Sequence, residues 1–89
     1  MLHLLFLSPI PDAILARVDA KDALVFLENA VLALLQNNAL LMNKQCYVLA
    51  TDLAVRGINV DELPPNIHVI DYADFVALSV KHPIAQSWT

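Results

Sequence analysis

Two short segments of this 89-residue chain, residues 23–27 (ALVFL) and 46–50 (CYVLA), are apolar at nearly every position. A strand with one face in water alternates apolar and polar residues, whereas a strand covered by helices on both faces is apolar throughout. The pattern therefore favours a parallel sheet in an α/β fold. Residues 2–7 and 67–70 are two further candidate strands, so we predict a small open sheet of about four strands flanked by helices.

Helix start and stop signals fall between and after these segments. The predicted helices are residues 13–18, a helix from Asn29 towards Asn37 and Asn38, residues 51–57 and residues 71–82. Thr51 can cap the third helix, Gly57 can end it in a left-handed conformation, and Pro83 stops the fourth. Alternating strands and helices with short connections imply right-handed crossovers and a mainly parallel sheet. We expect one domain over residues 1–89.

Apolar residues make up 58% of the chain and charged residues only 16%. A domain this short buries only about 60–65% of its unfolded surface, so it carries more apolar side chain than its own core readily holds. A membrane span needs about 20 apolar residues in succession, and the richest stretch, residues 23–35, is interrupted by Glu28 and Asn29. Since no export signal is recognisable, we expect a cytoplasmic protein that uses the surplus to contact a partner chain.

The charged residues do not indicate a nucleic-acid or cofactor site. The formal net charge is −4 and the basic residues are scattered, whereas binding to a phosphate backbone needs a cluster of Lys and Arg. One glycine is too few for a phosphate-binding loop. His3, His68 and His82 stand far apart and lack the spacing of metal ligands. We therefore expect no cofactor, no metal and no direct contact with nucleic acid.

Cys46 is the only thiol of the sequence. A reactive cysteine needs access to solvent and a lowered pKa, which a helix N-terminus or a nearby cation can supply. Cys46 falls instead at the start of a predicted buried strand, with Lys44 as its neighbouring cation. This placement favours a structural role, and a nucleophilic role is the alternative.

Three aromatic residues in the C-terminal part are candidates for contact with a partner. Tyr72 and Phe75 share a face of the last predicted helix, and Trp88 lies in the segment that follows it. Aromatic residues at helical spacing are usually core, but buried aromatics also anchor interfaces. We predict that Tyr72, Phe75 and Trp88 belong to a partner interface. For Trp88, docking back on its own domain is the alternative.

Three stretches of sequence, spread over nearly the whole chain, carry a family resemblance. They are Met1-Leu2-His3 with Ser8-Pro9, residues 47–57 (YVLATDLAVRG), and residues 69–76 (VIDYADFV) followed by Lys81-His82-Pro83 and Trp88. In this combination the sequence resembles the TusB/DsrH family of small sulfur-relay subunits. Lys81-His82-Pro83 is more similar to the TusB branch.

The resemblance implies a flavodoxin-like α/β sandwich shared with two sister subunits, the TusC- and TusD-like chains. It implies a heterohexamer that passes persulfide sulfur to a TusE-like acceptor, towards 2-thiolation of the tRNA wobble uridine. In such complexes the sulfur-carrying cysteine belongs to the TusD-like subunit, so this chain would be an accessory, non-catalytic subunit. The DsrH branch implies dissimilatory sulfur oxidation instead.

The sequence departs from the family pattern in ways that leave alternatives open. Some DsrH-type relatives carry a cysteine in the first helix, but residues 12–18 contain none and Cys46 lies elsewhere. Glu28-Asn29 replaces the usual Asp-Gly, and the first helix and the 31–47 interval are shorter than usual. One alternative makes Cys46 itself a persulfide carrier, and another makes the chain a stand-alone ligand-binding domain.

Overall fold

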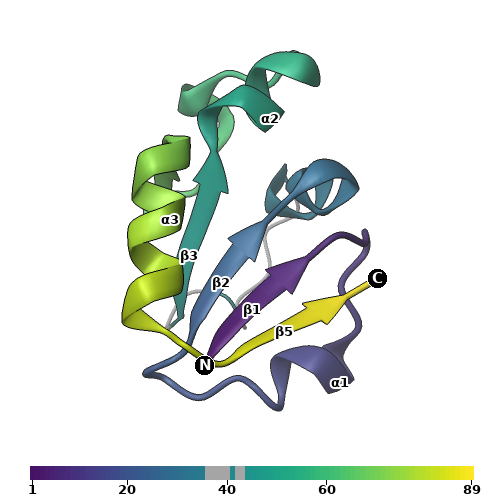
Figure 1. The fold of residues 1–89 in the computed structure, drawn as a ribbon. Helices are drawn as coiled ribbons and strands as arrows, with labels where there is room; N and C mark the ends of the chain where they lie inside the picture. The colour runs from purple at the N-terminus through teal and green to yellow at the C-terminus, as the bar shows by residue number, and fades with distance from the viewer. Residues whose placement is uncertain (36–40, 42–43) are drawn as a thin grey trace.

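The sheet has five strands, all parallel, in the order β4-β3-β2-β1-β5 (Figure 1). It is taken from a computed structural model that describes residues 1–35, 41 and 44–89. In chain order the elements are β1 (Leu2–Leu5), α1 (Asp12–Leu15), β2 (Ala23–Phe26), η1 (Glu28–Leu35), β3 (Gln45–Leu49), α2 (Ala50–Val55), η3 (Val60–Glu62), β4 (Ile67–Ile70), α3 (Tyr72–Lys81) and β5 (Ala85–Trp88). The predicted α/β class and parallel sheet are confirmed, with five strands in place of about four.

The additional strand is β5, which lies beside β1 at the edge of the sheet. Its register pairs Leu2 with Ala85 and Leu5 with Trp88. The sequence of β5, Ala-Gln-Ser-Trp, contains one large apolar residue, and its first three residues are exposed. A short edge strand of this kind lacks the continuous apolar pattern that identified β2 and β3.

The ends of two helices follow the predicted signals. Asp71 and Asp74 form a capping box at the start of α3, in which the Asp74 N–H donates to Asp71 Oδ1 over 2.8 Å. Helix α2 ends at Val55, and Gly57, two residues further on, has a φ of 66°. The Ile58 N–H donates to the Leu53 carbonyl over 3.0 Å, which is the hydrogen bond of a Schellman ending.

Two other helix predictions need correction. Thr51 does not cap α2, because the chain turns directly from β3 into a helix that begins at Ala50, and Thr51 already lies in its first turn. The segment predicted as a helix from Asn29 is the 3₁₀ helix η1, which starts one residue earlier at Glu28. The predicted end of that helix, residues 37–38, lies outside the described residues.

Apolar layers pack on both faces of the sheet. On the first face, α1, η1 and α2 cover one core cluster, whose members include Leu5, Leu15, Leu24, Phe26, Val31, Leu34, Val48 and Leu53. On the second face α3 packs through Phe75 and Leu78 against a smaller cluster of Leu2, Ala23, Val25 and Leu27. Within the described residues, no helix is long and apolar enough to span a membrane.

The second face of the sheet is only partly covered. Strands β1 to β4 follow one another across the sheet, and only the β4–α3–β5 crossover returns over the second face. Five strands span about 20 Å, whereas one helix is about 10 Å across. In the described part of the chain, α3 lies alongside β3 and no helix lies over β1 and β5 on that face (Figure 1). The two-sided coverage expected from the apolar strands is therefore incomplete.

Candidate partner-binding surface and the buried cysteine

Cys46 lies near the start of β3 and is fully buried in the first-face core. Its thiol lies 3.8 Å from the Leu41 carbonyl, to which it donates a weak hydrogen bond. Burial raises the pKa of the Cys46 thiol to about 12, against a smaller opposing effect of the Lys44 charge. A thiol in this setting is protonated at neutral pH and shielded from solvent, which is the opposite of what a nucleophilic cysteine needs.

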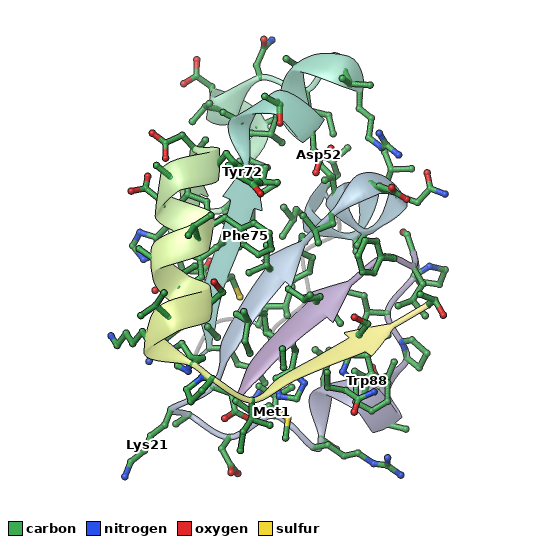
Figure 2. All side chains as sticks on the ribbon, in the orientation of Figure 1. Met1, Lys21, Asp52, Tyr72, Phe75 and Trp88 are labelled. Atoms are coloured by element: carbon green, nitrogen blue, oxygen red, sulfur yellow. The ribbon has the colours of Figure 1, made fainter. Side chains whose placement is uncertain are left out.

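Helix α3 presents two different apolar faces. Phe75 and Leu78 point inward and pack on the sheet. Tyr72, Val76 and Val80 follow one another every four residues and are exposed, by 73%, 44% and 77% respectively. We call these three residues the α3 stripe. The prediction of one shared aromatic face therefore needs refinement, because Phe75 belongs to the core contact and Tyr72 to the stripe, with their rings meeting edge to face at 6.3 Å (Figure 2).

Further apolar side chains lie on the same side of the sheet as α3. Leu4 and Phe6 are partly buried against the second-face cluster. Exposed apolar patches often mark a site where another protein binds. The partly buried members of this cluster include Leu4 on β1, Phe6 just after it, and Tyr47 and Leu49 on β3.

Trp88 lies away from the α3 stripe, at the opposite edge of the sheet (Figure 2). Its indole is partly buried against the first-face core, and its Nε1–H donates to Nδ1 of His3 over 3.1 Å. The described structure thus docks Trp88 on its own domain. Tyr72, Phe75 and Trp88 do not form one continuous patch, and their contact with a partner stays a prediction.

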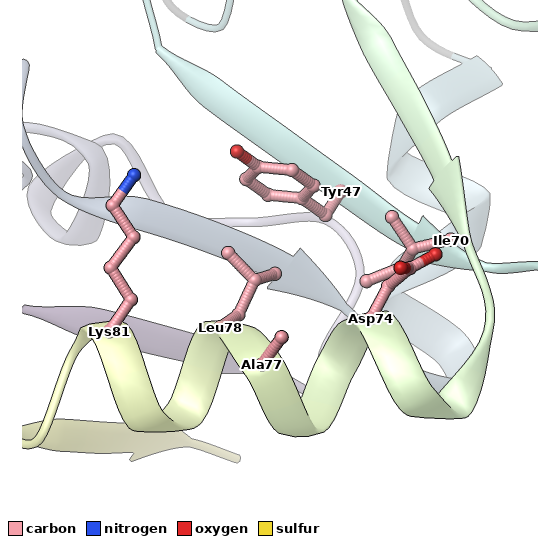
Figure 3. A pocket seen from close by; sticks show the side chains of 6 residues that line it. All are labelled: Tyr47, Ile70, Asp74, Ala77, Leu78 and Lys81. Carbon is pink, nitrogen blue, oxygen red and sulfur yellow. The ribbon is translucent and has the colours of Figure 1, made fainter.

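A groove of about 270 Å³ separates α3 from the β3–β4 side of the sheet (Figure 3). Lys81 lies at one end, Asp74 and Ile70 lie at the other, and the Tyr47 ring lies across from Leu78 between them. Asp74 is already engaged, because its carboxylate accepts from the Asp71 N–H over 3.3 Å. Among the described residues that line the groove, Lys81 is the one basic side chain, and they form no arrangement suited to acid–base or nucleophilic catalysis.

The histidines lie in three separate environments. His3 is buried and lies 2.9 Å from Asp22, His68 is exposed on β4 against the Tyr47 ring, and His82 follows the last residue of α3. Among the described residues no group of three or more His, Cys, Asp or Glu side chains could hold a metal ion. The contact between His3, Asp22 and Trp88 was missed from the sequence. The pairing of β1 with β2 places Asp22 beside His3, and the unpredicted pairing of β1 with β5 adds Trp88.

Comparisons with known proteins agree with this fold. The family model of DsrH-like proteins matches residues 7–84. Protein TusB from Buchnera aphidicola subsp. Baizongia pistaciae is 38% identical over 99% of this chain and 100% of its own length. Protein TusB from Escherichia coli (strain K12) is 36% identical with the same coverage.

A solved structure is similar as well. The solution structure of protein Tm0979 from Thermotoga maritima superimposes with a TM-score of 0.69, covering 92% of this chain and 94% of that one. At 22% sequence identity this similarity supports the fold alone. The family model and the full-length TusB relatives together mean that this chain belongs to the DsrH-like family, which includes the TusB proteins.

Proposed function

We propose that this chain is an accessory, non-catalytic subunit of a TusBCD-like sulfur-relay complex. In this role it assembles with TusC- and TusD-like sister subunits into a heterohexamer that passes persulfide sulfur to a TusE-like acceptor, towards 2-thiolation of the tRNA wobble uridine. Membership of the DsrH-like family, with full-length TusB relatives, supports the assignment. A sister subunit carries the sulfur in the cytoplasm, and this chain contributes a surface to which the sister subunits bind.

The observation that carries the proposal is the exposed α3 stripe beside a partly covered sheet face. Tyr72 and Val80 are exposed by 73% and 77% although both are large apolar side chains. Burying a valine or a larger apolar side chain contributes about 1.5–3 kcal/mol, so the stripe can supply several kcal/mol to an interface. A sister subunit packed on α3 would bury the exposed side chains of the stripe.

The buried cysteine supports the non-catalytic part of the proposal. A persulfide carrier exposes its thiolate to donor and acceptor, whereas Cys46 is fully buried and has a raised pKa. We therefore expect the cysteine that carries sulfur to lie on the TusD-like chain. A DsrH-type role in sulfur oxidation is the second candidate, favoured by the match to the DsrH-like family model.

Co-expression with TusC- and TusD-like chains tests the proposal, with native mass measurement of the purified assembly. Val80→Asp is the informative variant, and Val55→Asp is its matched control. Both valines lie in the last turn of a helix and are almost equally exposed, at 77% and 78%. We expect Val80→Asp to lose the assembly and Val55→Asp to keep it, while both monomers unfold at similar urea concentrations.

The result that would overturn the proposal is a wild-type chain that stays monomeric in the presence of both sister subunits. Normal assembly of Val80→Asp would leave the complex possible but reject α3 as its interface. In cells that lack the endogenous gene, restoration of 2-thiouridine in tRNA distinguishes the tRNA pathway from sulfur oxidation.

A further inference from the structure

Three side chains from distant parts of the chain meet beside the β1–β5 pair. His3 lies on β1, Trp88 lies on β5, and Asp22 lies just before β2. The Trp88 Nε1 lies 3.1 Å from Nδ1 of His3, and Nε2 of His3 lies 2.9 Å from Oδ2 of Asp22. The His3 and Trp88 rings are nearly parallel, with an interplanar angle of 17°.

These contacts fix the protonation state of the imidazole. An indole N–H can only donate, so Nδ1 of His3 must present its lone pair to Trp88. In the neutral ring the hydrogen then resides on Nε2, which donates it to the Asp22 carboxylate. His3 is only 2% exposed, so its two protein partners, and not bulk water, satisfy both ring nitrogens. Trp88 docking thus requires a neutral His3 in one tautomer.

The charged side chain in direct contact with His3 is that of Asp22. The other carboxylate oxygen of Asp22, Oδ1, accepts from the Met1 amino group over 2.8 Å. Burial by itself opposes ionisation of Asp22, but hydrogen bonds from the Met1 amino group, His3 and the Asp19 N–H outweigh it and hold the pKa of Asp22 well below its usual range. The carboxylate therefore stays charged across the range in which an imidazole titrates.

Among the described residues, Asp22 is the only charged side chain hydrogen-bonded to the His3 ring, and Lys44, just before β3, donates instead to the Val18 carbonyl over 3.4 Å. The strand neighbours of His3 in the register are Leu24 on β2 and Gln86 on β5, both neutral. The charged side chains of α1 and of the connection to β2 are all exposed, apart from Asp22: Asp12, Arg17, Asp19 and Lys21. A protonated His3 ring therefore faces the Asp22 carboxylate through Nε2 and the Trp88 indole through Nδ1.

We propose that His3 is a proton-sensitive latch that holds the Trp88 indole against the sheet. The added proton binds to Nδ1, the one ring nitrogen that carries no hydrogen in the neutral form. The imidazolium keeps its hydrogen bond to Asp22, but its new N–H faces the indole N–H, so donor meets donor. Acidification therefore releases the indole while the His3–Asp22 pair stays in place. This device is independent of the sulfur-relay role.

Release is local because the β5 backbone has its own attachments. The Leu2 N–H donates to the Ile84 carbonyl over 2.9 Å, and the Phe6 N–H donates to the Trp88 carbonyl over 3.0 Å. These bonds do not depend on the charge of His3. Protonation removes one hydrogen bond and leaves a buried donor unpaired. These two effects lower the ratio of docked to undocked indole by roughly tenfold or more.

Trp88 is the only tryptophan, so intrinsic fluorescence reports the latch directly. The wild-type chain is titrated from about pH 8 to pH 5, the range in which imidazoles ordinarily change charge, and far-UV circular dichroism checks that the fold persists. We expect the emission maximum to shift to the red as the pH falls. In His3→Asn, whose side-chain oxygen can accept from the indole but gains no proton in this range, we expect no shift. His68→Gln should behave as wild type.

A second measurement needs no variant of His3. Nitrogen-15 NMR of the wild-type chain at about pH 8 should give Nδ1 of His3 the shift of an unprotonated acceptor and Nε2 the shift of a protonated donor. A hydrogen on Nδ1 at that pH would refute the latch. Constant wild-type emission across the titration, or the same red shift in a folded His3→Asn chain, would refute it as well.

Discussion

Cys46 offers the sharpest quantitative test of how this chain takes part in sulfur transfer. Its pKa is raised by burial from 9.0 to about 12. At pH 7.5 a thiol with a pKa near 12 is ionised in roughly one molecule in 30,000, against about one in 30 for a thiol at 9.0. Because only the thiolate reacts, ionisation alone should slow modification of the folded chain about 1,000-fold.

The assay is the rate of reaction with a disulfide reagent such as Ellman's reagent, under native conditions and in urea. The urea-unfolded chain supplies the reference rate of the same cysteine in an open environment. We expect the folded chain to react at least about 100-fold more slowly, since local opening can recover part of the 1,000-fold effect. A slowing of less than about tenfold would refute the account of Cys46 as a protected core residue.

The same shift predicts how the stability of the folded chain depends on pH. The pKa of Cys46 is higher in the folded state, so above about pH 9 the unfolded chain loses the thiol proton while the folded chain keeps it. The ionisation of Cys46 therefore leaves the free energy of unfolding unchanged below pH 9. Above pH 9 it lowers that free energy by about 1.4 kcal/mol per pH unit, until the folded thiol also ionises near pH 12.

Cys46→Ala isolates this effect from the ionisation of tyrosines and lysines, which both proteins share. At pH 7 the variant should be less stable by about 1–2 kcal/mol, because it loses one buried heavy atom and leaves a small cavity. Between pH 9 and 11 the difference should shrink and then reverse, as urea unfolding at each pH will measure. Cells that carry Cys46→Ala should retain tRNA thiolation, and a complete loss with intact assembly would restore the alternative that Cys46 carries the persulfide.

Three further substitutions test particular contacts by urea unfolding. Glu28 has a φ of 51°, in the left-handed region, so Glu28→Gly should stabilise the chain by about 0.5–1 kcal/mol while Glu28→Ala should not. Asp71→Ala removes the capping box of α3 and should cost about 1 kcal/mol, whereas Asp71→Asn should retain most of the cap. Asp22→Asn should cost about 2–3 kcal/mol at pH 7. Because the pKa of Asp22 is lowered in the folded state, that cost should diminish as the pH falls below the ordinary aspartate value of 3.8; a cost that stays constant down to pH 2 would contradict the assignment.

Residues with strong local signals were the ones that the sequence predicted well. The apolar runs placed β2 and β3 because a strand inside a parallel sheet has few residues that can be polar. Gly57 and Asp71 marked helix ends because each end needs a particular backbone angle or hydrogen-bond acceptor. The family resemblance, carried by short stretches over the whole chain, was confirmed by full-length relatives.

Contacts that depend on long-range pairing were not predictable in the same way. Nothing local in Ala-Gln-Ser-Trp indicates a strand, and β5 forms because the crossover through α3 delivers residues 85–88 to the free edge of β1. The His3–Trp88 hydrogen bond is a consequence of that register. Periodicity likewise placed Tyr72 and Phe75 on one helical face, but in the structure Phe75 packs on the sheet and Tyr72 is 73% exposed.

The apolar surplus of the sequence can now be located within the fold. The first face absorbs most of it, because three helices cover a sheet whose strands β2 and β3 are nearly all apolar. The second face has one helix, α3, which carries the exposed side chains of Tyr72, Val76 and Val80. A chain under selection only for its own stability would replace Tyr72, Val76 and Val80 with polar residues at little cost, since surface substitutions usually change stability by less than about 0.5 kcal/mol. Their presence on the one incompletely covered face is therefore better explained by a partner than by the fold, and the comparison of Val80→Asp with Val55→Asp measures that difference directly.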